Sequence, residues 1–159
     1  MQIGIMADSH DNLPAIRRAL TRLKAEGAEG LVHAGDFVAP FAVREILKFD
    51  GPVTACFGNN DGERAGIRNL LPDVREAPAL LSLGGRRILL VHDAAEATPD
   101  LQAGAEVMIF GHTHEPVIER IDGRLRINPG EAGGWLHGSH TVAMLDTDTF
   151  EARILEFQP

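Results

Sequence analysis

Phe110-Gly111-His112-Thr113-His114 is the stretch that says most about how this chain folds and what it binds. The residues just before it, Glu106 to Phe110, form a short apolar run rich in strand formers, which predicts a buried strand. Gly111 ends that strand and lets the backbone turn. Because the two histidines are one residue apart, an extended loop would point both rings the same way. Such a pair is typical of a transition-metal site. Two exposed loop histidines are the alternative unless the chain supplies further ligands.

Polar side chains also follow four other apolar runs that we expect to be strands. Asp8 and His10 come after residues 2–7, Asp36 after 30–34, Asn59 after 52–57, and His92 after 86–91. Ligands of open α/β sheets bind at the carboxyl ends of the strands, and right-handed crossovers bring such ends to one edge. Taken singly, each stretch is also compatible with a turn or a helix cap. Together they predict one shared site.

The order of the predicted elements indicates an α/β fold. Helical spacing of apolar residues predicts helices that start at Leu13 and end at Gly27, and over residues 40–49, 63–71 and 94–103. The second half contains hairpins that turn at Gly84-Gly85 and at Asp122-Gly123, and a final antiparallel pair over residues 141–145 and 150–157. We therefore expect two mixed β-sheets packed as a sandwich and flanked by helices, in one domain spanning residues 1–159.

Composition restricts the classes of protein that the chain can belong to. Its 159 residues are 44% hydrophobic and 24% charged, which is typical of a soluble globular domain. No apolar run reaches the roughly 18 residues that would span a bilayer, and the N-terminus has no basic segment of a signal peptide. With a single cysteine, Cys56, we expect a cytoplasmic protein. A net charge of -8 argues against a nucleic-acid duplex as partner.

The residues at the strand ends form a mixed set of nitrogen and oxygen donors. They are Asp8, His10, Asp36, Asn59, His92, His112 and His114. Two carboxylates, one amide and four imidazoles are too many for one tetrahedral zinc site, but they suit two neighbouring ions. A set without thiolates favours Mn, Fe, Zn, Co or Ni over Ca or Mg.

These motifs, in this order, resemble those of the calcineurin-like metallophosphoesterases. The matching positions are Asp8-x-His10, Gly35-Asp36, Gly58-Asn59-x-Asp61, His92 and Gly111-His112-x-His114, and the later Asn128-Pro129-Gly130 turn resembles that of the small single-domain phosphodiesterase branch. The resemblance covers nearly the whole chain. It implies a four-layer α/β/β/α fold and a dinuclear phosphodiesterase acting on small phosphodiesters, with Mn as the favoured ion.

The resemblance also implies a role for each ligand. Asp8, His10 and His114 would bind the first ion, Asn59, His92 and His112 the second, and Asp36 would bridge both. A hydroxide shared by the two ions would attack the phosphorus atom. The two ions would outweigh the charges of Asp8 and Asp36, which favours an anionic substrate.

The chain departs from the family pattern at two positions. Asn60 stands where many members have a histidine, and an amide can bind phosphate but cannot act as a general acid near pH 7. Asp61, which we also include in the candidate catalytic pair, has two interpretations: it orients the Asn60 loop, or it is a structural turn residue. Asp93 replaces a common glycine and adds negative charge beside the site.

Several alternatives stay open at the level of sequence. His33 precedes its loop, which favours a buried, hydrogen-bonded histidine over a ligand. The glycine-rich segment from Glu131 to His140 carries the one tryptophan, Trp135, and could cover the site, form a contact in a homo-oligomer, or be an ordinary surface loop. The rival functions are a non-catalytic protein-binding scaffold, such as the retromer subunit of this fold, a nuclease, and a nucleotide or sugar-phosphate monoesterase.

Overall fold

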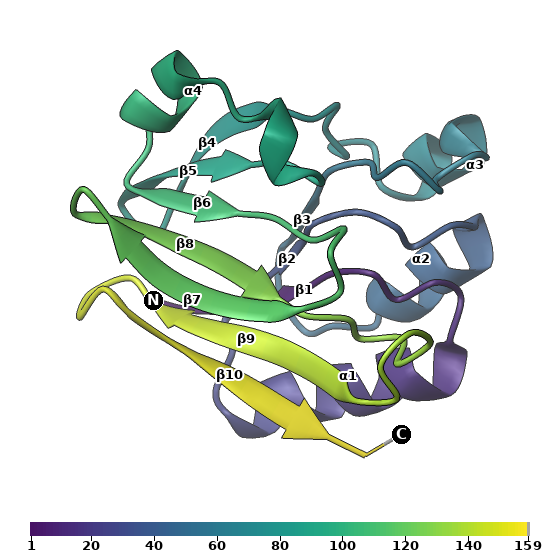
Figure 1. The fold of residues 1–159 in the computed structure, drawn as a ribbon. Coiled ribbons are helices and arrows are strands. Elements are labelled where there is room, and N and C mark those ends of the chain that lie inside the picture. Colours follow the sequence, from purple (N-terminus) through teal and green to yellow (C-terminus); the bar gives the residue numbers. More distant parts are fainter. Residues whose placement is uncertain (159) are drawn as a thin grey trace.

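Two five-stranded sheets face each other in the computed structural model, which describes residues 1–158 (Figure 1). Pro159, the last residue of the predicted domain, lies outside the described residues. The first sheet has the strand order β10-β9-β1-β2-β3 and the second the order β4-β5-β6-β8-β7. Each contains both parallel and antiparallel neighbours, so the prediction of two mixed sheets is confirmed.

The helices and strands alternate in the first half of the chain, and hairpins dominate the second. In chain order the elements are β1 (Gln2–Met6), α1 (Leu13–Ala25), β2 (Gly30–His33), α2 (Pro40–Ile46), β3 (Val53–Ala55), α3 (Arg64–Leu70), β4 (Ala79–Leu83), β5 (Arg86–Leu90), the 3₁₀ helix η1 (Ala94–Glu96), α4 (Pro99–Ala103), β6 (Val107–Ile109), β7 (Pro116–Ile121), β8 (Arg124–Pro129), β9 (His140–Asp146) and β10 (Glu151–Phe157). Among residues 1–158, none of the helices is long and apolar enough to cross a membrane.

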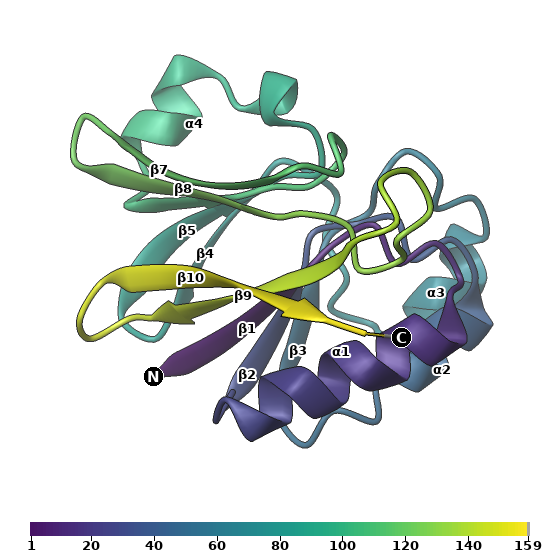
Figure 2. The same ribbon diagram turned by 60° about the horizontal axis from the view of Figure 1, so that its bottom comes forward.

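Three apolar layers separate the four layers of secondary structure. Ile3 and Ile5 of β1, and Ala7 just after it, point to one face and pack between the two sheets against residues such as Ile88 and Ile109. Met6 points to the opposite face, where α1, α2 and α3 cover the first sheet. A smaller apolar cluster lies between the second sheet and α4. Figure 2 shows this sequence of layers, and the predicted α/β/β/α order is confirmed.

Parallel pairing places the loops that carry the candidate ligands at one edge. β1, β2 and β3 run parallel, with Ile5 opposite Val32 and Val32 opposite Thr54. In the second sheet β5, β6 and β8 are likewise parallel. The carboxyl ends within each of these parallel sets point the same way, so the loops that follow them gather at an edge.

The predicted helix over residues 94–103 is wrong as a single element. The structure has a 3₁₀ helix over Ala94–Glu96 and a separate α4 over Pro99–Ala103. Pro99 forces the residue before it out of the helical region, and Thr98 is accordingly extended with ψ 156°. α2 also ends at Ile46, three residues before the predicted end at Phe49.

A buried carboxylate joins the helices on the outer face of the first sheet. Arg17 of α1 donates two hydrogen bonds to Glu45 of α2, at 2.9 and 3.3 Å, and Lys48 donates two more. These bonds lower the pKa of Glu45 from near 4.5 to about 2. Because the folded-state pKa is the lower one, the stabilisation is fully present above pH 4.5 and is lost as the pH falls towards 2.

We expect Glu45→Gln to destabilise the fold by about 1 kcal/mol at pH 7, since both cationic partners are largely exposed. Urea denaturation at pH 7 and pH 3 measures the effect, and the difference from wild type should shrink at the lower pH. Glu156→Gln, at an exposed position of β10, is the matched control. An equal difference at both pH values would contradict a stabilising role for the ionised Glu45.

Candidate metal centre

All seven predicted ligands lie on loops that directly follow strands. Asp8 and His10 follow β1, Asp36 follows β2, Asn59 follows β3, His92 follows β5, and His112 and His114 follow β6. Two sets of three side chains offer ligand atoms that all lie within 4.8 Å of one another. They are Asp8, His10 and His114, and Asp8, Asp36 and His92. Predicted residues up to 106 positions apart in sequence are therefore neighbours in space.

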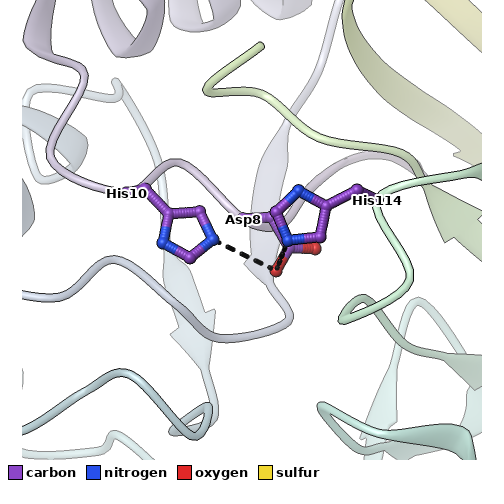
Figure 3. Close-up of side chains that lie close together, drawn as sticks. All are labelled: Asp8, His10 and His114. Carbon is purple, nitrogen blue, oxygen red and sulfur yellow. Dashed lines mark ion pairs between the residues drawn. The ribbon is translucent and has the colours of Figure 1, made fainter. Parts of the chain in front are cut away.

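The first set converges on one carboxylate oxygen. Oδ1 of Asp8 lies 3.8 Å from Nε2 of His10 and 3.6 Å from Nε2 of His114 (Figure 3). The two imidazoles are stacked, with ring centroids 5.2 Å apart. One carboxylate and two imidazoles therefore face a single point, the arrangement that a transition-metal ion requires of its ligands.

Asp36 lies between this set and the remaining predicted ligands. Its Oδ2 is 3.6 Å from Nε2 of His10 and 3.4 Å from Nε2 of His92. On the far side, Oδ1 of Asn59 lies 3.0 Å from Nε2 of His92 and 3.0 Å from Nδ1 of His112. The Asp36 carboxylate thus borders both halves of the cluster, as a bridging ligand would.

Hydrogen bonds on the outer side of two rings set which nitrogen faces the centre. Nδ1 of His92 donates to the carbonyl of Ala34 at 2.7 Å, because a carbonyl oxygen can only accept. Nδ1 of His114 is bonded to the carboxylate of Glu131. In both residues Nε2 is the nitrogen that faces the other ligands. Metal-binding histidines are commonly held by such partners.

Burial and mutual contact shift the pKa values of these side chains. Burial raises the pKa of Asp8 to about 6 and lowers the pKa of His10. Burial alone would also raise the pKa of Asp36, but hydrogen bonds from His92 and Asn60 outweigh it and hold that pKa well below its usual range. Burial opposes the charge on His92, and the adjacent Asp36 outweighs it and raises the His92 pKa to about 9.

The backbone of the site adopts conformations that ordinary residues avoid. Five predicted ligands have φ between 39° and 69°: Asp8, His10, Asp36, His112 and His114. Each such residue costs on the order of 1–3 kcal/mol, and strain of this kind clusters at functional sites. Glycines allow the close approach of the loops, since a Cβ on Gly111 would lie 2.7 Å from Oδ2 of Asp8.

The two predicted catalytic residues, Asn60 and Asp61, both contact the Asp36 loop. Asn60 donates from its backbone and its side-chain amide to the Asp36 carboxylate, at 2.8 and 2.7 Å. Asp61 is buried and accepts hydrogen bonds from the backbone amides of Asp36, Val38 and Gly58. These contacts hold the Asp36 and Asn60 loops together, and a catalytic role for Asp61 stays a prediction.

Two buried polar atoms of the cluster have no hydrogen-bond partner within residues 1–158. They are Oδ1 of Asp8 and Nε2 of His10, and they face each other across the first set of ligands. Burying a polar atom without a partner is costly, and native proteins rarely leave one unsatisfied. A carboxylate oxygen and an imidazole nitrogen are also preferred donors for a divalent transition metal. The residues present therefore fit the metal that the sequence predicts.

Two further residues behave differently from the ligands. His33 is fully buried, its Nδ1 accepts from the amide of Gly35, and its Nε2 is bonded to Ser9. Burial lowers the pKa of His33 to about 3, so it is neutral, and the prediction of a buried, hydrogen-bonded histidine is confirmed. Asp93 caps η1 and lies 3.8 Å from Nε2 of His112, whereas Asn59 contacts Nδ1 of that ring.

Sequence reasoning missed Glu131 as a candidate functional residue. Its carboxylate is buried, bonds His114 and accepts from the backbone amides of Leu136 and His137. A signal was present, because Glu131 follows β8 just as the predicted ligands follow their strands. The sequence predicts β8 only as a hairpin arm, whereas it also pairs in parallel with β6.

Two surface hollows flank the cluster. The first, the apolar hollow, has a volume of about 340 Å³ and is lined by His10, Asn60, His114, Trp135 and Leu136. The second, the polar hollow, has a volume of about 310 Å³. Its lining includes Asn59, His92 and His112 together with the charged side chains of Arg64, Glu76, Asp93 and Glu96. The centre is therefore open to a ligand with a substituent on either side.

Comparison with known proteins identifies the class to which this fold and site belong. The family model of the calcineurin-like phosphoesterase superfamily domain matches residues 1–150. The chain is 37% identical to a phosphodiesterase of Methanocaldococcus jannaschii, with 96% of this chain and 97% of that one covered. It is 30% identical to the phosphodiesterase YfcE of Escherichia coli, with 99% and 94% covered.

Solved structures agree with this grouping. A structure of an archaeal phosphodiesterase superposes with a TM-score of 0.90 at 35% identity, over 99% of this chain and all of the other. Zinc-complexed Vps29 of Entamoeba histolytica shares the fold, with a TM-score of 0.72 at 16% identity over 99% of this chain and all of the other. The chain belongs to the calcineurin-like phosphoesterase superfamily. The predicted family is confirmed, and so is the prediction of a phosphoric ester hydrolase that uses divalent metal ions.

Proposed function

We propose that this chain is a dinuclear metal-dependent phosphodiesterase that hydrolyses small phosphodiesters. The observation that carries the proposal is the pair of buried, unpartnered atoms, Oδ1 of Asp8 and Nε2 of His10, within a cluster of seven ligand-type side chains. A divalent cation would satisfy both atoms at once, because a carboxylate oxygen and an imidazole nitrogen are preferred ligands of transition metals.

The proposed first ion is held by Asp8, His10 and His114, and the proposed second by Asn59, His92 and His112. Asp36 contacts both sets and is assigned to both ions. Nitrogen and oxygen donors without thiolates suit Mn, Ni, Co, Zn and Fe, and of these we propose Mn. When bound, two such ions polarise a phosphoryl group and increase the acidity of water.

The residues around the ions define the substrate. Two divalent cations outweigh the charges of Asp8 and Asp36, which favours a phosphate anion in an otherwise acidic protein. The amide of Asn60 lines the apolar hollow and can donate a hydrogen bond to a phosphate oxygen, but it cannot protonate a leaving group near pH 7. Esters whose leaving group departs without a proton are therefore the preferred substrates.

A diester fits the shape of the site better than a monoester. The apolar and polar hollows lie on opposite halves of the ligand set, so a phosphate between them can carry one substituent on each side. The matching relatives are themselves named phosphodiesterases. A monoester would leave one of the two hollows unused.

The proposal is tested by removing bound metal with a chelator and then adding back Mn, Ni, Co, Zn or Mg. We expect no hydrolysis without metal, restored cleavage of bis-(p-nitrophenyl) phosphate with a transition metal, and slower cleavage of the mono-ester. Elemental analysis should find two ions per chain. A protein that binds two ions but cleaves neither ester would support the scaffold alternative, and one that binds no metal would overturn the assignment of the cluster.

We also propose a cytoplasmic enzyme that does not bind a nucleic-acid duplex. The single cysteine, Cys56, is buried, and burial raises the pKa of its thiol, so it is unreactive in a reducing compartment. The net charge of -8 opposes binding along a polyanion. Homo-oligomerisation stays a prediction, and the mass of the protein in solution at increasing concentration tests it.

A further inference from the structure

The loop of residues 130–138, here called the platform loop, is fastened to the loop that carries two metal ligands. The amide of Gly133 donates to the carbonyl of Asp8 at 3.0 Å, and the carbonyl of Gly133 accepts from the side chain of Asn12 at 2.8 Å. The indole Nε1 of Trp135 donates to the carbonyl of His10 at 3.2 Å. The platform loop is therefore held at a fixed position beside the first set of ligands.

This anchored loop exposes two large apolar side chains. Trp135 is 63% and Leu136 67% exposed, although hydrogen bonds hold the platform loop in place. Glu131 secures the other end of the loop by accepting from the amide of Leu136 at 2.8 Å. Apolar surface held open to water is unfavourable, so a ligand that covers it gains free energy on binding.

The exposed pair shares the apolar hollow with the ligand residues. Trp135 and Leu136 line it on one side, and His10, His114 and Asn60 line it on the other. A group seated there would be attached directly to a phosphate at the metal centre. We propose that the apolar hollow binds a planar aromatic substituent of the phosphodiester substrate, a phenyl-type ring or a nucleobase, with Trp135 and Leu136 as its specificity-determining residues.

The chemistry of the two hollows explains why the ring is assigned to this side. An indole face stacks on a flat ring at little entropic cost, and Leu136 adds an aliphatic contact. The polar hollow is lined by the charged side chains of Arg64, Glu76, Asp93 and Glu96. An uncharged ring bound there would displace the water that hydrogen-bonds to these side chains and would offer them no hydrogen bonds in return. The inference rests on the proposed function, since it specifies the substituent of a phosphodiester that the metal centre is proposed to cleave.

Intrinsic fluorescence tests this inference directly, because Trp135 is the one tryptophan of the sequence and tyrosine is absent from it. The full chain is loaded with Zn²⁺, a d¹⁰ ion without redox chemistry. It is titrated with phenylphosphonate and methylphosphonate, and in a second pair with thymidine monophosphate and deoxyribose 5-phosphate. Each pair shares its anionic group and differs in the ring. The first pair reports on a simple ring and the second on a nucleobase.

We expect the ring-bearing member of at least one pair to bind about tenfold tighter and to shift the emission of Trp135. Calorimetry with Trp135→Ala and Leu136→Ala should show this preference falling towards unity. Leu80→Ala, at a 51% exposed position on β4, is the matched control and should keep the preference. Thermal melts establish that each variant is folded.

Three outcomes would overturn the inference. Equal binding of ringed and ringless anions, with bis-(p-nitrophenyl) phosphate still cleaved, would remove it and leave the proposed function standing. Emission that changes with protein concentration, together with a dimeric mass, would assign Trp135 and Leu136 to a subunit contact. Absence of both anion binding and hydrolysis would overturn the proposed function, and this inference with it.

Discussion

We expect Asp36→Asn to lower metal-restored phosphodiester hydrolysis by far more than the 10- to 100-fold that is usual when a residue hydrogen-bonded to a metal ligand is replaced. The reason is its position, because the Asp36 carboxylate is within 3.6 Å of His10 in one half of the cluster and 3.4 Å of His92 in the other. An amide has the same shape but no charge, and it turns a donor towards Asn60, which itself donates to Asp36. Both proposed ions lose a shared ligand in one substitution.

The measurement is kcat for bis-(p-nitrophenyl) phosphate, with the number of ions per chain determined on the same samples. Asp50→Asn makes the same substitution at a 73% exposed side chain remote from the cluster and should keep wild-type values. Thermal melting should show that Asp36→Asn remains folded, since its backbone contacts do not depend on the charge. A variant with two ions and at least half of the wild-type activity would refute the bridging assignment.

Much of the fold could be predicted because many of its strands and turns are specified by residues that are close together in the sequence. Apolar runs followed by polar loops identify β1, β2 and β3, and Asp122-Gly123 with φ of 52° and 76° makes the predicted hairpin turn between β7 and β8. The same rule found the ligand-type residues, since a polar side chain directly after a strand lies at the edge where parallel strands end. The structure brings them together, and their roles as ligands stay a prediction.

The remainder depends on contacts between distant segments. β8 pairs with β6 in parallel, and β9 joins the first sheet beside β1. The local sequence pattern of these strands does not indicate which strand each one pairs with. Sequence reasoning missed Glu131 for this reason. Glu131 reaches the edge that carries the predicted ligands only because β8, the strand before it, pairs in parallel with β6. The left-handed backbone of Asp8 and Asp36 was equally hidden, since neighbouring loops impose it on residues that do not prefer it.

Glu131→Gln is expected to lower metal affinity about 10- to 100-fold while leaving the platform loop in place. In the wild type, one carboxylate oxygen accepts from the amides of Leu136 and His137, at 2.8 and 3.3 Å, and the other bonds Nδ1 of His114. A carboxylate only accepts, so Nδ1 carries the proton and Nε2 keeps a free lone pair towards Asp8.

The glutamine can satisfy the two loop amides only by turning its oxygen to them. Its amide group then faces Nδ1 of His114, which becomes an acceptor, and the ring proton moves to Nε2, where it blocks metal binding. Glu115→Gln makes the same charge change one residue from His114 at an exposed position and is the control.

Calorimetric metal titration and nitrogen NMR of the His114 ring separate this positioning role from a structural one. We expect weaker binding of the first ion and a proton on Nε2 in Glu131→Gln, with Trp135 emission and the melting temperature close to wild type. Glu131→Ala should lose both metal affinity and the order of the loop, because two backbone amides then lack their acceptor. If the glutamine variant binds both ions with wild-type affinity, His114 needs no carboxylate to orient it, and Glu131 serves the loop alone.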